Sequence, residues 1–192
     1  MIIGITGGTG CGKTTLLECV RQRGGLVLDC DAIYHQLLTR DDRLLRAIED
    51  RFPGTVENGQ LQRKKLGAIV FSDPAALEDL NRITHGAVKA EVIRQLADAP
   101  ALAAIDAIAL FEGGLAPLCH VTVAVTAPTE DRVRRLMARD GISEEYARSR
   151  IAAQHDDGWF LDRCGWALEN MDTKMHFVEK CVAFLDQLDI IK

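Results

Sequence analysis

Short apolar runs and helical stretches alternate at the start of the chain. Residues 1–6 form an apolar run, and residues 13–23 carry apolar side chains at helical spacing until Gly24 and Gly25 end the pattern. A second apolar run, residues 26–31, follows at once and ends in two aspartates. This order predicts a strand, a glycine loop, a helix and a second parallel strand, joined by a right-handed crossover.

Residues 32–98 have a mostly helical pattern. Leucine and isoleucine recur at helical spacing up to Pro53 and Gly54, which break it. A further helix is expected to begin at Asp73 and Pro74, because these residue types are favoured in the first positions of helices.

Two more apolar runs, residues 103–111 and 121–126, predict further parallel strands because each stops where polar residues or glycines begin. Residues 128–157 are charge-dense and helical in pattern, and residues 166–170 indicate a short last strand. The chain is expected to end in an amphipathic helix. Its apolar face contains Phe177, Val178, Cys181, Phe184, Leu185 and Leu188.

Composition and charge restrict the classes of function. The 192 residues are 47% hydrophobic and 27% charged, which is typical of globular proteins. With the alternation of strands and helices described above, one α/β domain is expected over residues 1–192. With 23 basic and 28 acidic residues, the net charge of -5 produces no overall field that attracts nucleic acid or anionic lipid. No apolar stretch approaches the roughly 20 residues of a membrane-spanning helix. We therefore expect a soluble cytoplasmic protein without nucleic-acid or membrane partners, and a monomer is favoured.

The six cysteines are widely separated and form no CxxC pair. This spacing argues against a zinc site and against a short disulfide framework. Free thiols suit a reducing compartment. The cysteines are Cys11, Cys19, Cys30, Cys119, Cys164 and Cys181.

Residues 7–14 read GGTGCGKT and satisfy the pattern GxxxxGK[ST]. The motif lies between the first predicted strand and helix. There, glycines let backbone N–H groups turn toward phosphate oxygens, and the helix N-terminus adds partial positive charge. A glycine turn that binds nothing needs no lysine and hydroxyl directly after its last glycine. The loop is therefore predicted to hold a polyphosphate.

Within this loop, Lys13 is expected to reach the β- and γ-phosphates of ATP, and the Thr14 hydroxyl to ligate Mg²⁺. Thr15 is a further candidate phosphate contact. Cys11 has two interpretations: an oxidisable thiol whose pKa the helix N-terminus lowers, or a small residue that fills a tight loop. The predicted ATP-binding residues are Gly8, Thr9, Gly10, Cys11, Gly12, Lys13, Thr14 and Thr15.

Asp29 and Asp31 end the second predicted strand. Because the carboxyl ends of neighbouring parallel strands converge on one crevice, both carboxylates are expected beside the glycine loop. One of them is then expected to face Lys13 and metal-bound water, and the other an acceptor hydroxyl. The alternative for either residue is a cap for the helix that follows near Ala32.

Six motifs carry a resemblance to a known family. They are GITGGTGCGKTT, LDCDAI, LGAIVFSDPAALEDLNRITH, LFEGGL, VTVAVTAPTEDRVRRLMARDGISEEYARSRIAAQ and ALEN. Over nearly its whole length the chain resembles the dephospho-CoA kinases, which complete coenzyme A synthesis. The resemblance implies an enzyme that phosphorylates the 3'-hydroxyl of dephospho-CoA with ATP, giving coenzyme A and ADP.

The resemblance also implies a P-loop kinase fold with three parts. A core sheet is expected at about residues 1–31, 99–127 and 160–192, a helical acceptor-binding segment at about 60–98, and a helical lid at about 128–157.

By motif position, Asp31 resembles the base that takes the proton from the 3'-hydroxyl, and Lys13 resembles the lysine that serves ATP. Arg139 matches the lid arginine that contacts the transferring phosphoryl group. Arg63 and His85 match acceptor-binding positions. For His85, a hydrogen-bonded role in the core is the alternative.

The chain departs from the family pattern at several positions, and these departures leave a second acceptor class open. The alternative is another small-metabolite or nucleoside P-loop kinase. An ATP-binding regulator without transfer is less favoured, because Asp31 and Arg139 are retained. The departures include Gln62, Gly86, Ile108, Arg132, which stands where glutamine is usual, and Gly165.

Arg132, Arg135 and Arg139 share one helical face at spacing i, i+3 and i+7. Residues 132–150 hold six arginines and three acidic residues, a local charge of +3 within a chain of net charge -5. Such a concentration of positive charge suits a closing element that meets phosphates.

Neighbouring charged residues have plainer interpretations. Arg134 and Arg148 are expected in salt bridges on a solvated face. Arg150 and Gln154 lie four residues apart, and they either fasten the lid to the core or remain exposed.

The segment after the predicted lid is rich in histidine, acids and aromatics. His155, Asp156 and Asp157 are expected in a solvated turn rather than in a metal site, because adjacent residues of a helix point in different directions. The aromatic residues are interpreted as packing residues, with the adenine pocket as the alternative for one of them. They are Trp159, Phe160 and Trp166.

Overall fold

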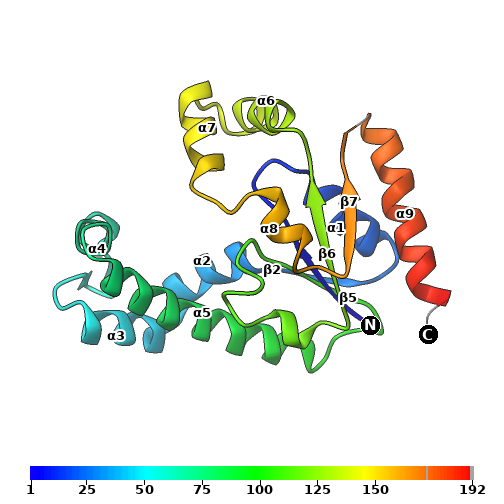
Figure 1. The fold of residues 1–192 in the computed structure, drawn as a ribbon. Helices are drawn as coiled ribbons and strands as arrows, with labels where there is room; N and C mark the ends of the chain where they lie inside the picture. Colours follow the sequence, from blue (N-terminus) through cyan, green and yellow to red (C-terminus); the bar gives the residue numbers. More distant parts are fainter. Residues whose placement is uncertain (172, 191–192) are drawn as a thin grey trace. The chain divides into compact units, whose positions relative to one another are not determined.

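The computed structural model describes residues 1–171 and 173–190 (Figure 1). The chain forms two units, each with its own hydrophobic core. Unit 1 consists of Met1–Leu28, Ala99–Leu110 and Leu115–Lys192, and unit 2 of Asp29–Asp98 and Phe111–Gly114.

Unit 1 is built on a five-stranded sheet, whose strands are β1 (Ile2–Thr6), β2 (Leu26–Asp29), β5 (Ala103–Asp106), β6 (Val121–Thr126) and β7 (Trp166–Glu169). Their order is β2-β5-β1-β6-β7. β1 pairs in parallel with β5 and β6, and β6 pairs in parallel with β7. Residues 3–6 of β1 are all buried, as expected for a central strand covered on both faces, because successive side chains point to opposite faces.

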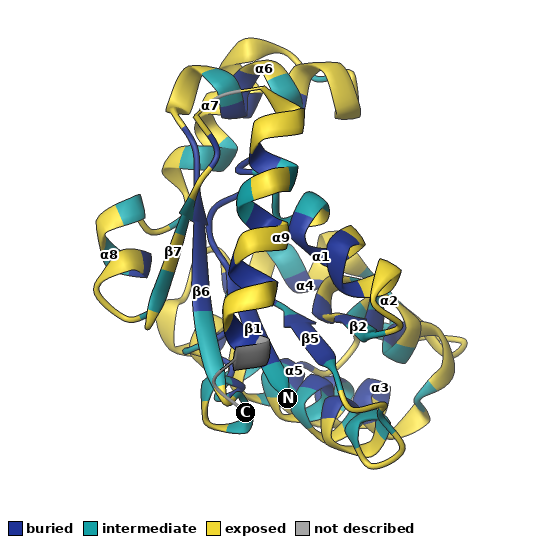
Figure 2. Cartoon of the chain, turned by 90° about the vertical axis from the view of Figure 1, so that its right-hand side faces the viewer, coloured by how far each residue is buried: buried dark blue, intermediate teal, exposed yellow. Residues whose placement is uncertain are grey.

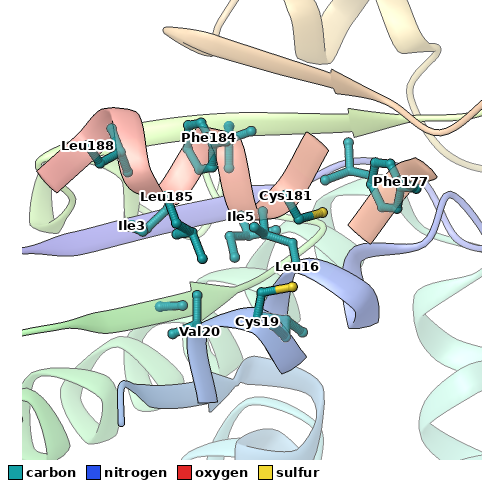
Figure 3. Packing of buried hydrophobic residues seen from close by; sticks show 14 of the residues in the cluster. Ile3, Ile5, Leu16, Cys19, Val20, Phe177, Cys181, Phe184, Leu185 and Leu188 are labelled. Carbon is teal, nitrogen blue, oxygen red and sulfur yellow. The ribbon is translucent and has the colours of Figure 1, made fainter. Parts of the chain in front are cut away.

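Two helices of unit 1, α1 (Lys13–Gln22) and α9 (Lys174–Ile190), lie side by side against the sheet (Figures 1 and 2). The predicted apolar face of the last helix is buried here. Figure 3 shows Phe177, Cys181, Phe184, Leu185 and Leu188 of α9 in one cluster with Leu16, Cys19 and Val20 of α1 and Ile3 and Ile5 of β1. This cluster fixes the start of α1 against the central strand.

Three helices follow β6: α6 (Thr129–Asp140), α7 (Glu144–Ala152) and α8 (Asp157–Leu161). The predicted helical stretch 128–157 is therefore interrupted twice. Gly141 ends α6 with a φ of 65°. Ser143 and Asp156 then cap α7 and α8, because each side chain accepts a hydrogen bond from a backbone N–H three residues later. Val133, Leu136 and Ala147 form a small core between α6 and α7.

Unit 2 is mainly helical, with α2 (Cys30–Arg40), α3 (Asp42–Arg51), α4 (Arg63–Val70) and α5 (Pro74–Leu96), and a hairpin of β3 (Val56–Glu57) and β4 (Gln60–Leu61). The predicted start of α5 is confirmed, since Asp73 accepts a hydrogen bond of 2.9 Å from the N–H of Ala75. Within the described residues, no helix combines the length and the apolar character that a membrane crossing requires. The core of unit 2 contains Leu38, Leu44, Leu45, Ile48, Phe52, Leu66, Val70 and Ala76.

Two predicted strands are shorter in the structure by two residues or more. The strand predicted over residues 26–31 ends at Asp29, because the Asp29 side chain accepts a hydrogen bond of 3.0 Å from the N–H of Ala32 and starts α2. The strand predicted over residues 103–111 ends at Asp106. Beyond it the chain turns back, and the carbonyl of Leu110 accepts hydrogen bonds from two later backbone N–H groups.

The hairpin of β3 and β4 lies in the region that we expected to be mostly helical. Its turn residues are Asn58 and Gly59, with φ values of 51° and 73°. An Asn-Gly pair is the preferred turn of two-residue hairpins, because both residues tolerate positive φ. This pair was the sequence signal for the hairpin.

Candidate active site

The glycine loop lies between β1 and α1, so the predicted strand–loop–helix context is confirmed. Gly7, Gly10 and Gly12 have φ values of 128°, 79° and 102°, a left-handed backbone region that favours glycine. Gly12 is the N-cap of α1 and supplies no side-chain cap. Five other helices are capped by an Asp or Ser side chain. The amides of Lys13 and Thr14, the first two of α1, therefore meet no side-chain cap and are left available to an anion, whereas the Thr15 amide donates to the carbonyl of Gly12.

Lys13 folds back over this loop. Its ammonium donates hydrogen bonds to the carbonyls of Gly7 at 2.9 Å and Gly8 at 3.4 Å. These carbonyl contacts keep the cation beside the cradle. Thr14, the next residue, is exposed at the open end of α1, and Thr15 is half-buried.

A side chain at Gly7 would meet the backbone of the neighbouring strand, since a Cβ there would lie 2.1 Å from the carbonyl oxygen of Val125. No side-chain rotation relieves that contact. We expect Gly7→Ala to lower the Tm by about 6 to 12 °C, which corresponds to about 3 kcal/mol for a chain of this size.

The matched control is Gly24→Ala. Gly24 also has a positive φ of 74°, but no atom lies within 4 Å of the added Cβ. Only the left-handed backbone conformation then opposes the substitution, at about 1 kcal/mol or about 2 to 4 °C. Scanning calorimetry that gives the same Tm loss for both variants contradicts the steric argument.

Four side chains from distant parts of unit 1 hold the backbone of the glycine loop. Asn170 donates a hydrogen bond of 2.9 Å to the carbonyl of Cys11, and Arg135 donates to the carbonyls of Gly10 and Cys11 at 3.2 and 3.3 Å. The other two, Arg132 and Gln154, bind the backbone of Thr9. Of the two interpretations of Gln154, the one in which it fastens the lid segment to the core is therefore confirmed. No loop contact is predicted from the sequence for Arg132, Arg135 or Asn170.

Cys11 is fully buried inside the loop. Burial raises the pKa of its thiol, and this effect outweighs the opposite influence of the nearby Lys13 charge. The interpretation of Cys11 as a thiol with a lowered pKa is therefore wrong. The other interpretation, a small residue that fills a tight loop, fits its position.

Asp140 joins the two helices of the predicted lid. Arg139 donates to both carboxylate oxygens of Asp140, at 2.6 and 3.0 Å, and Arg150 of α7 donates to one of them at 2.7 Å. The side chain of Arg139 is nonetheless 59% exposed, which leaves it free to exchange this partner for another anion. Arg150 thus fastens α7 to α6 within the predicted lid, and this contact does not join the lid to the core.

The two arginines hold the pKa of Asp140 at about 2, mainly through the hydrogen bonds from Arg139. Because the folded-state pKa is depressed, the contribution of the pair to stability is present above pH 3.8 and is lost as the pH falls through 2. We expect the Asp140 carboxyl signal to titrate near pH 2 in an NMR experiment, and to move upward in Arg139→Gln. A wild-type midpoint near pH 3.8 contradicts the arrangement.

The plainer interpretations of the neighbouring residues are confirmed. Arg134 pairs with Asp131, and Arg148 pairs with Glu130 and Glu144 at 2.8 Å, all on the surface of α6 and α7.

His155, Asp156 and Asp157 do not converge on one point. Asp156 caps α8, Asp157 lies 3.3 Å from Arg132, and the His155 ring stacks on Trp159 with centroids 3.9 Å apart. Each side chain therefore has a separate partner. Phe160 is fully buried, and Trp166 packs against Phe184, so both are packing residues.

In unit 2 the two aspartates have different positions. Asp29 is the N-cap of α2, which confirms the capping alternative for this residue. Asp31 lies in the first turn of α2 rather than at a strand end, and its side chain is exposed. Our expectation that both residues close the strand is thus wrong for Asp31, because the cap on Ala32 starts the helix one residue after Asp29.

The two predicted acceptor-binding residues also lie in unit 2. Arg63, the first residue of α4, is 3.3 Å from Nδ1 of His35 on α2. His85 of α5 is half-buried and lines a hollow of 460 Å³. The other lining residues are Glu78, Asn81, Arg82, Gly86, Glu112, Gly113 and Gly114.

Solved structures share this architecture. A crystal structure of a Thermus thermophilus protein aligns with a TM-score of 0.83 at 36% identity, covering 98% of this chain and 97% of that one. The fold is also that of a Bacteroides thetaiotaomicron shikimate kinase, with a TM-score of 0.59 at 15% identity, covering 98% and 97%. With the glycine loop between β1 and α1, these likenesses define the fold as that of a P-loop kinase.

The family model for dephospho-CoA kinases matches residues 1–175. The chain belongs to the dephospho-CoA kinase family. The Deinococcus radiodurans dephospho-CoA kinase is 40% identical over 192 residues, covering 98% of this chain and 92% of that one. A dephospho-CoA kinase of Thermus thermophilus is 38% identical over 172 residues, covering 88% and 83%.

Proposed function

We propose that the protein transfers the γ-phosphoryl group of ATP to the 3'-hydroxyl of dephospho-CoA, giving coenzyme A and ADP. One observation carries the proposal: the glycine loop of unit 1, with Lys13 folded over it and an uncapped α1, occurs in a chain of the dephospho-CoA kinase family. The names of the relatives supply the acceptor.

Unit 1 supplies the donor side in this proposal. The amides at the start of α1 and the Lys13 ammonium bind the phosphates of ATP. The exposed Thr14 hydroxyl suits Mg²⁺, because this ion takes hard oxygen ligands and completes its shell with phosphate oxygens and water. The ion, when bound, neutralises charge on the β- and γ-phosphates.

Unit 2 supplies the acceptor side. Arg63 and His85 are the proposed contacts of dephospho-CoA, and Asp31 is the proposed general base. As the 3'-oxygen forms its bond to the γ-phosphorus, Asp31 accepts the hydroxyl proton, and the bond from that phosphorus to the ADP oxygen breaks. The exposed carboxylate of Asp31, at the start of α2, is open to a substrate hydroxyl.

Arg139 is the proposed arginine of the lid, which spans about residues 128–157. Its Nε and Nη2 both donate to Asp140, and we expect Arg139 to exchange this carboxylate for a phosphoryl oxygen during transfer. Arg150 remains paired with Asp140 and compensates the carboxylate after the exchange. The exchange costs little for this reason.

Incubation of the purified protein with ATP, Mg²⁺ and dephospho-CoA tests the proposal. We expect mass spectrometry to show the gain of one phosphoryl group on the acceptor and stoichiometric ADP. A panel of nucleosides and small metabolite alcohols is the control. Phosphorylation of one of these instead of dephospho-CoA overturns the acceptor, and ATP binding without transfer to any acceptor overturns the activity.

We further propose that the protein acts in the cytoplasm as a monomer. The cysteines support a reducing compartment, because all six are free thiols in the structure. Light scattering of the purified protein tests the monomeric state.

A further inference from the structure

Both backbone polar groups of Thr9, the third residue of the glycine loop, are held by side chains from the helical segment after β6. The N–H of Thr9 donates a hydrogen bond of 2.8 Å to Oε1 of Gln154. Its carbonyl accepts a hydrogen bond of 2.9 Å from Nε of Arg132. Thr9 is only 6% exposed, so these two partners replace water. We call this arrangement of Arg132, Thr9 and Gln154 the Thr9 clamp.

Arg132 is an unusual residue for this place, because it is charged and only 4% exposed. Its Nη1 lies 3.3 Å from Oδ1 of Asp157, a single and rather long contact. Its Nη2 is buried and finds no hydrogen-bond partner among residues 1–171 and 173–190. A buried arginine with one unpaired donor stabilises a fold poorly. Stability alone therefore gives little reason for a charge at this position.

Arg132 also fits closely against the glycine loop. A Cβ at Gly8 would lie 2.1 Å from Nη2 and 2.7 Å from Cζ of Arg132. The guanidinium thus fills the space that a side chain at Gly8 would take. The loop backbone at Gly8 and Thr9 is enclosed by Arg132 on this side.

We propose that Arg132, together with Gln154, is a positioning residue that presets the glycine loop for the phosphates of ATP. A loop with three glycines at positive φ has many conformations, and ordering it during binding lowers affinity. The Thr9 clamp fixes one of these conformations before the nucleotide arrives. This inference rests on the proposed function only in that the loop binds ATP.

The clamp predicts a particular kinetic pattern. Because it orders the loop before binding, its loss raises the Kd and the KM for ATP about 10- to 100-fold, the scale of hydrogen bonds to a charged group. The kcat at saturating ATP falls by less than about threefold, and the KM for the acceptor is unchanged. A merely structural role would lower the Tm without moving the KM for ATP.

Calorimetric titration with ATP tests the inference in the full-length protein. Arg132→Met removes the donors and keeps a long side chain, whereas Arg132→Lys keeps the charge and one donor group and should recover part of the affinity. Arg134→Met is the matched control on α6, because Arg134 is exposed and pairs with Asp131 of its own helix. Equal ATP affinity in Arg132→Met and Arg134→Met overturns the inference.

A double-substitution cycle gives a second test. Gln154→Met removes the acceptor for the Thr9 N–H. If both side chains hold the same residue, the combined variant loses clearly less affinity than the product of the two single losses. Fully multiplicative losses, or tighter ATP binding by Gln154→Met, overturn the clamp. If Arg132→Met does not fold, the Kd values for ATP of Arg132→Lys and of Gln154→Met, each divided by the wild-type Kd, decide the test.

These outcomes are separate from those of the proposed function. If the wild-type protein binds ATP and does not phosphorylate dephospho-CoA, the acceptor assignment fails while the affinity ratios still decide the clamp. If dephospho-CoA is phosphorylated and the variants bind ATP as tightly as the wild type, only the clamp fails.

Discussion

Asp31→Asn is expected to lower kcat by about 10²- to 10⁴-fold, the contribution of a general base, while the Kd for ATP stays within about twofold. The substitution keeps the shape of the side chain and removes its ability to accept the hydroxyl proton. Because Asp31 is exposed in the first turn of α2, no core contact is lost and the Tm should change little. Steady-state assays with dephospho-CoA and calorimetry with ATP measure the two effects.

Asp29→Asn is the control for this experiment, since it is the same substitution two residues earlier. Asp29 caps α2, and asparagine caps helices as well as aspartate does, so folding and turnover should both be preserved. An Asp31→Asn variant with wild-type kcat removes Asp31 from its proposed role. A large kcat loss in Asp29→Asn would show that the base was assigned to the wrong aspartate.

The features predicted correctly are those that local pattern determines. The apolar run of β1, the glycine pattern and the amphipathic spacing of α9 each lie within a few residues of one another, so periodicity and motif spacing reveal them. The start of α5 was also predictable, because capping by Asp73 depends on residues directly next to it.

Errors in the predicted elements arise where a strand and a helix, or a helix and a hairpin, compete for the same short segment. A strand and a helix both satisfy the apolar character of residues 26–33, and the cap that Asp29 forms with Ala32 places Asp31 in the helix. Asn58 and Gly59 are a preferred turn pair of two-residue hairpins, and the hairpin forms there. The helical pattern of the surrounding residues favours a helical prediction for this region.

The contacts around the glycine loop depend on long-range packing, which no local pattern encodes. Arg132 meets Thr9 across 123 positions of the chain, and Asn170 meets Cys11 across 159. The i, i+7 spacing puts Arg132 and Arg139 on one face of the predicted helix. The spacing does not show that their environments differ, because that difference depends on how α6 packs. Arg132 is buried against the loop, whereas Arg139 remains exposed beside Asp140.

Lys13→Met is expected to weaken ATP binding about 10- to 100-fold and to lower kcat by about 10²- to 10³-fold. The ammonium of Lys13 is held at the glycine loop by the carbonyls of Gly7 and Gly8, so its charge is in place before the phosphates arrive. Methionine keeps the aliphatic stem and removes this charge. Both the bound triphosphate and the charge that develops during transfer then lose a compensating cation.

Arg21→Met, in the exposed last turn of α1, is the control for the loss of one positive charge from unit 1. It should leave the Kd for ATP and the kcat within about twofold, because an exposed charge about 12 Å along the helix from Lys13 is screened by salt. Calorimetry with ATP and initial rates at saturating ATP separate the binding loss from the loss in turnover. Undiminished ATP affinity in Lys13→Met contradicts the assignment of the glycine loop as the phosphate site. Weakened binding with an unchanged kcat restricts Lys13 to holding the ground-state nucleotide.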